Sequence, residues 1–298
     1  MSSDSDNTPA YSNNGPRDPD RDRLRDLVYG SMSAEFASVG DGKPATFPIT
    51  PFYDPEHETV VVSSPPAFSG KLENVRSDSR VSLLLRDAGG EYLVTGDARI
   101  RESDPEANAE YVRDLIESEP ATPKRKAHEQ SLDFLDSWIG QVLMGWYALR
   151  VVVEIESASM SHVSDVTSIE ELPSWQAVGM ERAEASRYDR AVITVVGDDG
   201  YPIIQPITDV RIHGRASVIE PVPTPVLYDS QPACLLLHWH DDAIEHLGQR
   251  VVFGRFRTDD EPPRFVPGSS TTFRRDGVFD TLRFIINGKW QTRAYLRG

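Results

Sequence analysis

The chain contains an ordered internal repeat, and this repeat limits what it can fold into more than any other feature. The segment 44–50, PATFPIT, returns at 202–208 as PIIQPIT, and each copy follows a Val-Gly-Asp and a further glycine. Two later matches keep the same order: they pair 82–85 with 234–237 and 149–153 with 282–286. Solenoid repeats recur about every 20–50 residues, far less than this period. The repeat therefore predicts two copies of one domain.

Length and composition agree with a soluble two-domain protein. The 298 residues leave room for two domains that each bury a core, and 39% of the residues are hydrophobic. No apolar run is as long as a membrane span, and no charged-then-apolar signal segment opens the sequence. The single cysteine, Cys234, excludes an intrachain disulfide and is typical of a buried strand position. We therefore expect a cytoplasmic protein without a membrane partner.

The charge balance is strongly acidic. Asp and Glu together number 47 against 31 Lys and Arg, of which only five are lysines, and the net charge is −16. Self-repulsion of this size costs stability unless salt screens it, which indicates a salt-rich cytoplasm such as that of halophilic archaea. A nucleic-acid partner is disfavoured, because phosphate backbones are bound by basic patches.

Hydrophobic patterning predicts a mainly β fold with flanking helices. A short helix over 21–29 opens the first copy, and Asp104-Pro105 and Thr122-Pro123 begin helices that end near 117 and 140. Turn signals at Gly42, Asp54-Pro55 and Gly89-Gly90 favour antiparallel hairpins. The expected strands are 34–40, 45–53, 58–64, 79–86, 91–101 and 145–156. Six short strands with a few helices describe a small barrel with helices at its rim.

The second copy is predicted to be a reduced version of the first. Its matching segments lie closer together, and 214–232 contains four prolines and no lysine. Its expected strands lie near 191–197, 202–212, 233–240, 250–257 and 279–287. The chain therefore divides into a disordered acidic tail (1–20), a first barrel (21–163), a linker (164–186) and a second, degenerate barrel (187–298).

One loop of the first copy has the composition of a phosphate cradle. Ser63 and Ser64 end the third strand, and Ser69-Gly70-Lys71 follow just before a short helical pattern. Serine hydroxyls, helix N–H groups and a lysine ammonium together are suited to an anion. The alternative is a polar capping loop with an exposed lysine.

These residues resemble the flavin-binding split barrel of the pyridoxamine 5′-phosphate oxidase superfamily. The resemblance rests on G-x-P-x-x-x-P-I-T-P-F-Y-D from Gly42, S-G-K-x-x-N from Ser69, and R-V-S-L-L-L from Arg80. It implies two tandem split β-barrels of the six-stranded antiparallel Greek-key type, with the second copy reduced. It also implies an FMN phosphate held in the loop after the third strand, with Ser64, Ser69 and Lys71 at the matching positions.

The resemblance implies further cofactor contacts. The strand at Pro48, Ile49 and Thr50 would run along the isoalloxazine ring, with Ser63 and Asn74 nearby. Thr46, Phe52 and Gly70 stand where true pyridoxamine phosphate oxidases carry basic residues, so oxidation of vitamin B6 is disfavoured. The flavin or deazaflavin reductase branches, of a halophilic archaeal type, fit better.

The expected activity is oxidoreduction of a small molecule with FMN, or a deazaflavin coenzyme, held by the first barrel. Such barrels usually pair around the cofactor, which here implies an intrachain pseudo-dimer or a homodimer. The competing classes are a non-enzymatic binder of flavin, deazaflavin or haem, and an interaction module without a cofactor. Because the cofactor supplies the redox chemistry, no catalytic acid–base pair is expected to stand out.

A second constellation lies in the other copy. His238-Trp239-His240 places two imidazoles on one face of a strand, followed by Asp241, Asp242 and His246. This spacing suits zinc, iron or haem, although a solvated strand is the simpler interpretation and no metal site is assigned. The tryptophans are expected at core or interface positions; they include Trp138, Trp146, Trp175 and Trp290.

Overall fold

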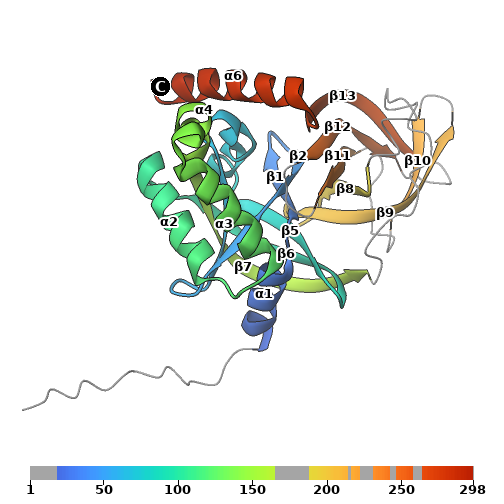
Figure 1. Ribbon diagram of the computed structural model, residues 1–298. Coiled ribbons are helices and arrows are strands. Elements are labelled where there is room, and N and C mark those ends of the chain that lie inside the picture. Colours follow the sequence, from blue (N-terminus) through green and yellow to red (C-terminus); the bar gives the residue numbers. More distant parts are fainter. Residues whose placement is uncertain are drawn as a thin grey trace, which may run out of the picture.

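The computed structural model describes residues 19–164, 188–213, 216–221, 231–241, 246–257 and 264–297. Within these ranges the chain forms two antiparallel sheets flanked by helices (Figure 1). The predicted mainly β class with flanking helices is confirmed. The acidic tail predicted for 1–20 lies outside the described residues except for the first two residues of a helix. The linker predicted for 164–186 lies outside them apart from its first residue.

The first copy is a curled seven-stranded sheet. Its order is β2-β1-β5-β6-β7-β4-β3, and the two edge strands are consecutive in the chain, separated only by Thr50. The single strand predicted over 45–53 is thus two strands, because Pro51 follows Thr50 and has no N–H to donate to a continuous ladder. The strands are β1 (Ala34–Gly40), β2 (Lys43–Ile49), β3 (Pro51–Asp54), β4 (Thr59–Ser64), β5 (Arg80–Asp87), β6 (Gly90–Ile100) and β7 (Val151–Ser164).

Local sequence explains how this sheet begins. Asp41 and Gly42 both adopt positive φ, 51° and 68°, which is the two-residue hairpin geometry that joins right-twisted strands. The helix α1 (Pro19–Gly30) places Leu24, Leu27 and Val28 against the sheet, where all three are buried in the first core.

Three helices cover the outer face of the first sheet: α2 (Pro105–Ser118), α3 (Pro123–Asp136) and α4 (Trp138–Ala148). Asp104, Thr122 and Ser137 cap them, each accepting a hydrogen bond from a backbone N–H in the first turn. The helix predicted to end near 140 ends instead at Asp136, because Ser137 starts a new helix. The strand predicted from 145 consequently begins only at Val151.

The second copy is a closed six-stranded barrel in the order β10-β13-β12-β11-β8-β9. Its strands are β8 (Arg190–Val196), β9 (Pro202–His213), β10 (Ala216–Pro221), β11 (Gln231–His240), β12 (Leu247–Arg257) and β13 (Arg264–Arg275). When β9 is matched to β2 plus β3, both sheets follow the same strand order. The copies differ between their last two strands, where the first inserts three helices, whereas only six residues, 258–263, separate β12 from β13 in the second and lie outside the described residues.

One predicted strand of the second copy is wrong. The segment 279–287 lies in the helix α6 (Val278–Tyr295), and the strand equivalent to β7 is β13. The helical spacing of its buried residues, Phe284, Gly288 and Thr292, is the signal that the repeat alignment obscured. No helix in the described ranges is long and apolar enough to cross a membrane.

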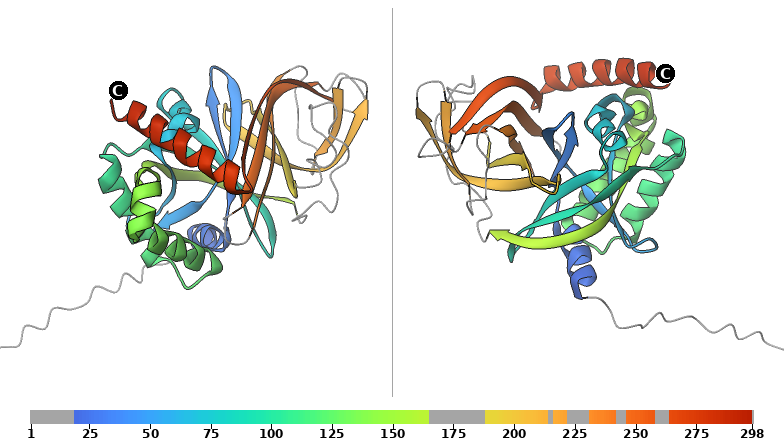
Figure 2. Two further views of the ribbon diagram at one scale, coloured as in Figure 1. Left: turned by 45° about the horizontal axis from the view of Figure 1, so that its top comes forward. Right: turned by 180° about the vertical axis from the view of Figure 1, so that it is seen from behind.

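The two barrels pack directly against each other. Ala37 and Leu84 of the first copy share a buried cluster with Val192 and Leu236 of the second, together with Cys234. Burial raises the pKa of the Cys234 thiol to about 12, as expected for a structural core cysteine. Figure 2 shows α6 leaving the second barrel and running along the first copy.

Hydrogen bonds also join the two barrels. Thr46 Oγ1 donates to Thr194 Oγ1 at 2.6 Å, and Ser82 Oγ donates to the carbonyl of Pro202 at 2.5 Å. Ser82 and Cys234 occupy equivalent positions in the repeat, so both copies use this strand position at the shared face. The matching segments 44–50, 82–85, 202–208 and 234–237 therefore all contribute residues to this interface.

Candidate functional site

A cavity of about 840 Å³ lies where the two copies meet. The first copy contributes β2, β4 and two short 3-10 turns, η1 (Pro66–Lys71) and η2 (Glu73–Arg76). The second copy contributes β11, β12, β13 and α6. Neither barrel forms this cavity alone.

Most of the residues predicted to bind a cofactor line this cavity. They are Pro48, Ile49, Thr50, Ser63, Ser64, Lys71 and Asn74. Ser69 is the exception, since it is buried beside the cavity and its hydroxyl donates to the carbonyl of Pro66 at 3.0 Å. Ser69 therefore stabilises the turn η1 instead of facing the cavity.

Ser64 and Lys71 offer unused polar groups at the junction of β4 and η1. Ser64 is buried, and its hydroxyl has no hydrogen-bond partner in the described structure. Among the described residues Lys71 forms no ion pair, and burial of its ammonium lowers the pKa to about 8. A buried donor and a desolvated cation without a counter-ion are the groups that an anion would satisfy.

Asn74 lines the cavity but also has a structural role. Its side-chain N–H donates to Ser38 Oγ at 3.3 Å, which fixes η2 on β1. A Cβ at Gly40 would collide with the Asn74 amide, so a larger residue there would displace the Asn74 side chain.

His128 of α3 and Arg150, just after α4, also line the cavity, and neither was predicted from the sequence. The Arg150 guanidinium donates to the carbonyls of Tyr147 and Leu149 and lies 5.1 Å from the Tyr147 ring centroid. Burial lowers the pKa of Arg150. Burial, followed by the charges of Lys124 and Arg150, also lowers the pKa of His128 to about 4, so its imidazole is neutral. The His128 Nε2 has no partner in the described structure.

The cavity is the opposite in charge to the chain around it. Its charged lining side chains among the described residues are Lys71, Arg150 and Arg275, and no Asp or Glu lines it. The chain as a whole carries 47 acidic residues and a net charge of −16. A concave site with this local balance is suited to an anionic ligand.

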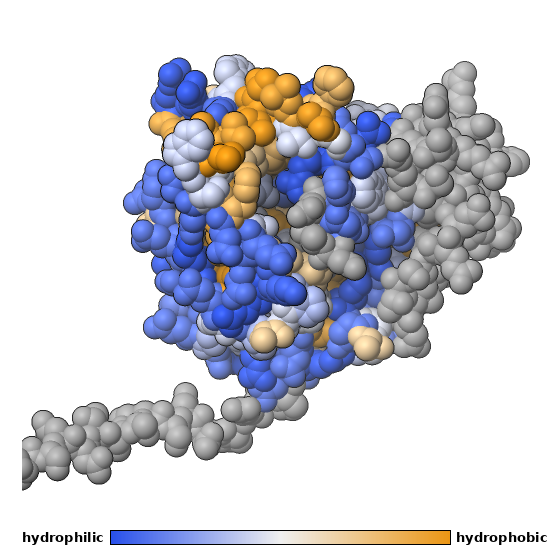
Figure 3. Space-filling model, viewed as in Figure 1, coloured by the Kyte–Doolittle hydropathy of each residue, from blue (hydrophilic) through white to orange (hydrophobic). Residues whose placement is uncertain are grey.

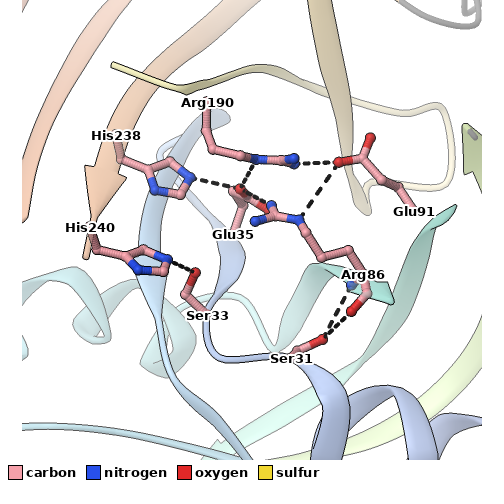
Figure 4. A network of polar contacts seen from close by, with 8 residues as sticks. All are labelled: Ser31, Ser33, Glu35, Arg86, Glu91, Arg190, His238 and His240. Atoms are coloured by element: carbon pink, nitrogen blue, oxygen red, sulfur yellow. Dashed lines mark hydrogen bonds and ion pairs between the residues drawn. The ribbon is translucent and has the colours of Figure 1, made fainter. Parts of the chain in front are cut away.

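The other end of the cavity contains the His-Trp-His strand. His238, Trp239 and His240 all line it, together with Ser33. Figure 4 shows the two imidazoles one above the other, His240 reaching Ser33 and His238 reaching Glu35. The nitrogen-to-oxygen distances are 2.8 Å for His240 Nε2 to Ser33 Oγ and 2.7 Å for His238 Nε2 to Glu35 Oε1.

Glu35 belongs to a buried ionic network that spans both copies. Arg86 bridges Glu35 and Glu91 within the first copy, and Arg190 of the second copy contacts the same two carboxylates. Burial alone would raise the pKa of Glu35, but the two guanidinium groups hold it well below its ordinary value. Glu35 is therefore a carboxylate that accepts the His238 Nε2–H.

This arrangement sets the proton position on His238. The side chain is 1% exposed, and burial lowers its pKa despite the neighbouring carboxylate. The neutral imidazole donates from Nε2 to Glu35, so Nδ1 carries a lone pair that finds no partner in the described structure. His238 lines the cavity, and its Nδ1 is a buried acceptor without a partner in the described structure.

A metal site is the alternative interpretation for the residues around His238 and His240. The described residues contain no group of three or more His, Cys, Asp or Glu side chains that could hold a metal ion. His246 is exposed, and its backbone N–H donates to Asp241 Oδ2 at 3.1 Å. Asp242, another member of the predicted constellation, lies outside the described residues, as does Trp175.

Aromatic side chains close the cavity on the α6 side. The Phe284 ring stacks on Phe68 of η1 with a centroid distance of 5.5 Å and an interplanar angle of 11°. Trp146 and Phe273 also pack on Phe284, at 5.3 and 5.8 Å. A Cβ at Gly288 would collide with Trp146, so glycine allows α6 to approach α4 closely. The helix α6 of the second copy therefore covers the turn η1 of the first.

No protein-family model and no curated protein matches the chain. Its structural neighbours include general stress protein 26 from Bacillus anthracis (TM-score 0.30, 15% identity, covering 48% of this chain and 92% of the neighbour). A second neighbour is a protein from Clostridium acetobutylicum related to general stress protein 26, of the pyridoxinephosphate oxidase family. It gives a TM-score of 0.31 and 12% identity, covering 47% of this chain and 84% of the neighbour. HutZ, the haem storage protein from Vibrio cholerae, gives a TM-score of 0.31 and 14% identity, covering 47% of this chain and 92% of HutZ. Each of these matches spans about half of the present chain.

Proposed function

We propose that the chain holds FMN, or a deazaflavin coenzyme of similar size, between its two copies and acts as an oxidoreductase on a small molecule. The observation that carries the proposal is the pair Ser64 and Lys71, an unpartnered hydroxyl and an ammonium without a counter-ion in the described structure, on one acid-free cavity. A phosphate would satisfy both groups.

The cavity fits such a coenzyme in size and chemistry. Its volume of about 840 Å³ lies within the roughly 300–1,000 Å³ usual for ligand pockets. Apolar and aromatic side chains make up much of its wall, among them Phe47, Phe68 and Phe284, and they suit a flat ring system.

Each part of the wall has a proposed task. Lys71 and Ser64 bind the phosphate, and the backbone of Pro48, Ile49 and Thr50 lines the polar edge of the ring. The α6 helix, through Phe284, excludes water from the loop. When bound, a flavin supplies the transfer of electrons or hydride, and the protein supplies orientation and a dry environment.

The second copy completes the site in this proposal. The His238 Nδ1 accepts a hydrogen bond from an N–H or O–H group of the bound small molecule, while Glu35 fixes the tautomer. The repeat would then be a duplication in which two barrels form an intrachain pseudo-dimer around one cofactor. The corresponding loop of the second copy, 222–230, lies outside the described residues.

The decisive experiment is a titration of the full chain with FMN in molar KCl, in which the quenching of flavin fluorescence measures binding. We expect saturation at one FMN per chain and loss of binding in the Ser64→Ala/Lys71→Ala double variant. Two sites per chain would contradict the degenerate second copy, and absence of binding at millimolar FMN and deazaflavin coenzyme would refute the proposal.

A carrier function is the second candidate, because two imidazoles line the same cavity. A storage protein for flavin, deazaflavin or haem needs binding without turnover. Titration with haemin separates the haem case: a shifted Soret band that disappears in the His238→Ala/His240→Ala variant would favour haem over FMN.

A further inference from the structure

The exposed large hydrophobic side chains of the described structure are concentrated on one face. All of them except Val266 lie in 134–143 or 278–296. Figure 3 shows this face as a group of orange side chains over α4 and α6. We call it the helical face; its main members are Trp138, Ile139, Val142, Phe279, Leu282, Ile286 and Trp290. Such a contiguous apolar patch on a protein surface marks an interaction site.

The α6 helix has two distinct apolar stripes. The inner stripe, Phe284, Gly288 and Thr292, is buried against the first copy. The outer stripe, Phe279, Leu282, Ile286 and Trp290, repeats at intervals of three and four residues and stays exposed, with Phe279 at 88% and Trp290 at 72%. This spacing is the seam that packs one helix against another.

The composition of the helical face is that of a protein interface core. The helix α4 carries no charged residue, and Trp138 is 77% exposed. Interface cores are enriched in aromatic residues and depleted of charge. An aromatic side chain buries about 150–250 Å². Three such side chains with their aliphatic neighbours therefore approach the roughly 800 Å² per partner of a stable interface.

We propose that a second copy of this chain docks on the helical face and forms a two-fold symmetric dimer. The barrel-to-barrel surface is already buried within the chain, so self-association must use another face. An isologous arrangement places each outer α6 stripe against its counterpart, which buries the same residues on both sides. This inference does not depend on the identity of the bound cofactor.

Charge favours a second copy over an anionic lipid surface. The helix α6 contains three basic residues and one acidic residue, whereas the chain carries −16 overall. The helical face is consequently where two acidic chains approach with less repulsion than elsewhere. An anionic bilayer would still repel the remainder of the molecule.

Sedimentation velocity of the full chain in molar KCl tests the proposal. We expect a dimer at micromolar concentration, and we expect Trp290→Glu to raise the dissociation constant at least about 30-fold, as for a central interface residue. Val266→Glu is the matched control, because Val266 is an exposed apolar residue outside the helical face, and it should leave the dimer unchanged. Circular dichroism confirms that each variant is folded.

Two results would overturn the proposal. A wild-type chain that stays monomeric at high micromolar concentration excludes the dimer, and co-sedimentation of that monomer with phosphatidylglycerol vesicles would assign the face to a membrane surface. A dimer that Trp290→Glu and Phe279→Glu both leave intact would place the interface elsewhere. Oxidative cross-linking of Ile286→Cys, but not of Val266→Cys, is the further result we expect, since Cys234 is buried.

Discussion

The two copies share one strand order but differ in what is attached to it. The first copy inserts η1, η2 and three helices between its strands, and these segments supply Lys71, His128 and Arg150 to the cavity. In the second copy only six residues separate β12 from β13, and α6 follows the last strand. Among the described residues the first copy thus contributes two of the cations that line the cavity, Lys71 and Arg150, and the second contributes Arg275 and the helix α6 that packs over η1.

The two copies also differ in net charge. Residues 21–163 contain 24 acidic and 15 basic residues, a net charge of −9, whereas 187–298 contain 14 of each. The acidic excess therefore belongs to the first copy, the tail and the linker. The buried network is shared, with Glu35, Arg86 and Glu91 from one copy and Arg190 and His238 from the other.

The largest expected effect comes from breaking this shared network. Glu35→Gln keeps an acceptor for His238 but leaves Arg86 and Arg190 with Glu91 as the remaining carboxylate. Removing one partner of a buried ionic group costs about 3–5 kcal/mol. We expect this loss in the free energy of unfolding measured in guanidinium chloride. Glu73→Gln, at an exposed pair with Arg76, should cost less than about 1 kcal/mol.

The same variant tests the pH dependence of the interface. The folded-state pKa of Glu35 is held below the ordinary value of 4.5, so its contribution to stability is present above that pH and is lost as the pH falls through the folded pKa. Glu91, whose pKa burial raises, acts in the opposite sense and remains in both proteins. We expect Glu35→Gln to flatten the acid limb of the stability profile. An unchanged acid limb would mean that the network does not join the copies in solution.

The next largest effect concerns α6, the helix of the second copy that packs over the first copy. Phe284→Ala removes a buried ring that contacts Phe68 and Trp146 of the first copy. Truncation of a buried phenylalanine costs about 3–5 kcal/mol, and the lower end applies here because the ring borders a cavity. Thermal unfolding measures the loss, with Val266→Ala as the control. A loss no larger than that of the control would show that α6 does not hold the copies together.

A smaller effect tests the division of ligand binding between the copies. Lys71→Ala should weaken FMN binding by about 1.5–3 kcal/mol, or roughly 10- to 150-fold, the scale of a hydrogen bond to a charged group. Because the pKa of Lys71 is about 8, FMN affinity should fall as the pH rises above 8, and Lys71→Ala should remove that dependence. Lys43→Ala, an exposed lysine on β2, is the matched control. Equal affinities for the two variants would remove Lys71 from the site.

Sequence patterns predicted the strands of the first copy well, because alternation and turn residues are local signals. Loop composition together with the family resemblance singled out Ser64 and Lys71, and both line the cavity. The helix α6 was mistaken for a strand, since a match of five residues outweighed the helical spacing of Phe284, Gly288 and Thr292. Arg150, His128 and His238 join the cavity only through packing between segments far apart in the chain. The His238-Trp239-His240 spacing had marked His238 as a candidate ligand, whereas no local signal marked Arg150 or His128.

The smallest effect we predict is a difference between the copies in their response to salt. Screening shortens the reach of charge repulsion from about 10 Å at 0.1 M to about 3 Å at 1 M, so added KCl should stabilise the chain. One kcal/mol corresponds to about 2–4 °C in melting temperature for a protein of this size class. The first copy carries the excess of negative charge, so backbone amide exchange should slow more in β1 to β7 than in β8 to β13 as KCl is added. Equal slowing in both sheets would mean that the copies unfold as one unit, and a melting temperature that falls with KCl would show that the acidic surface has another role.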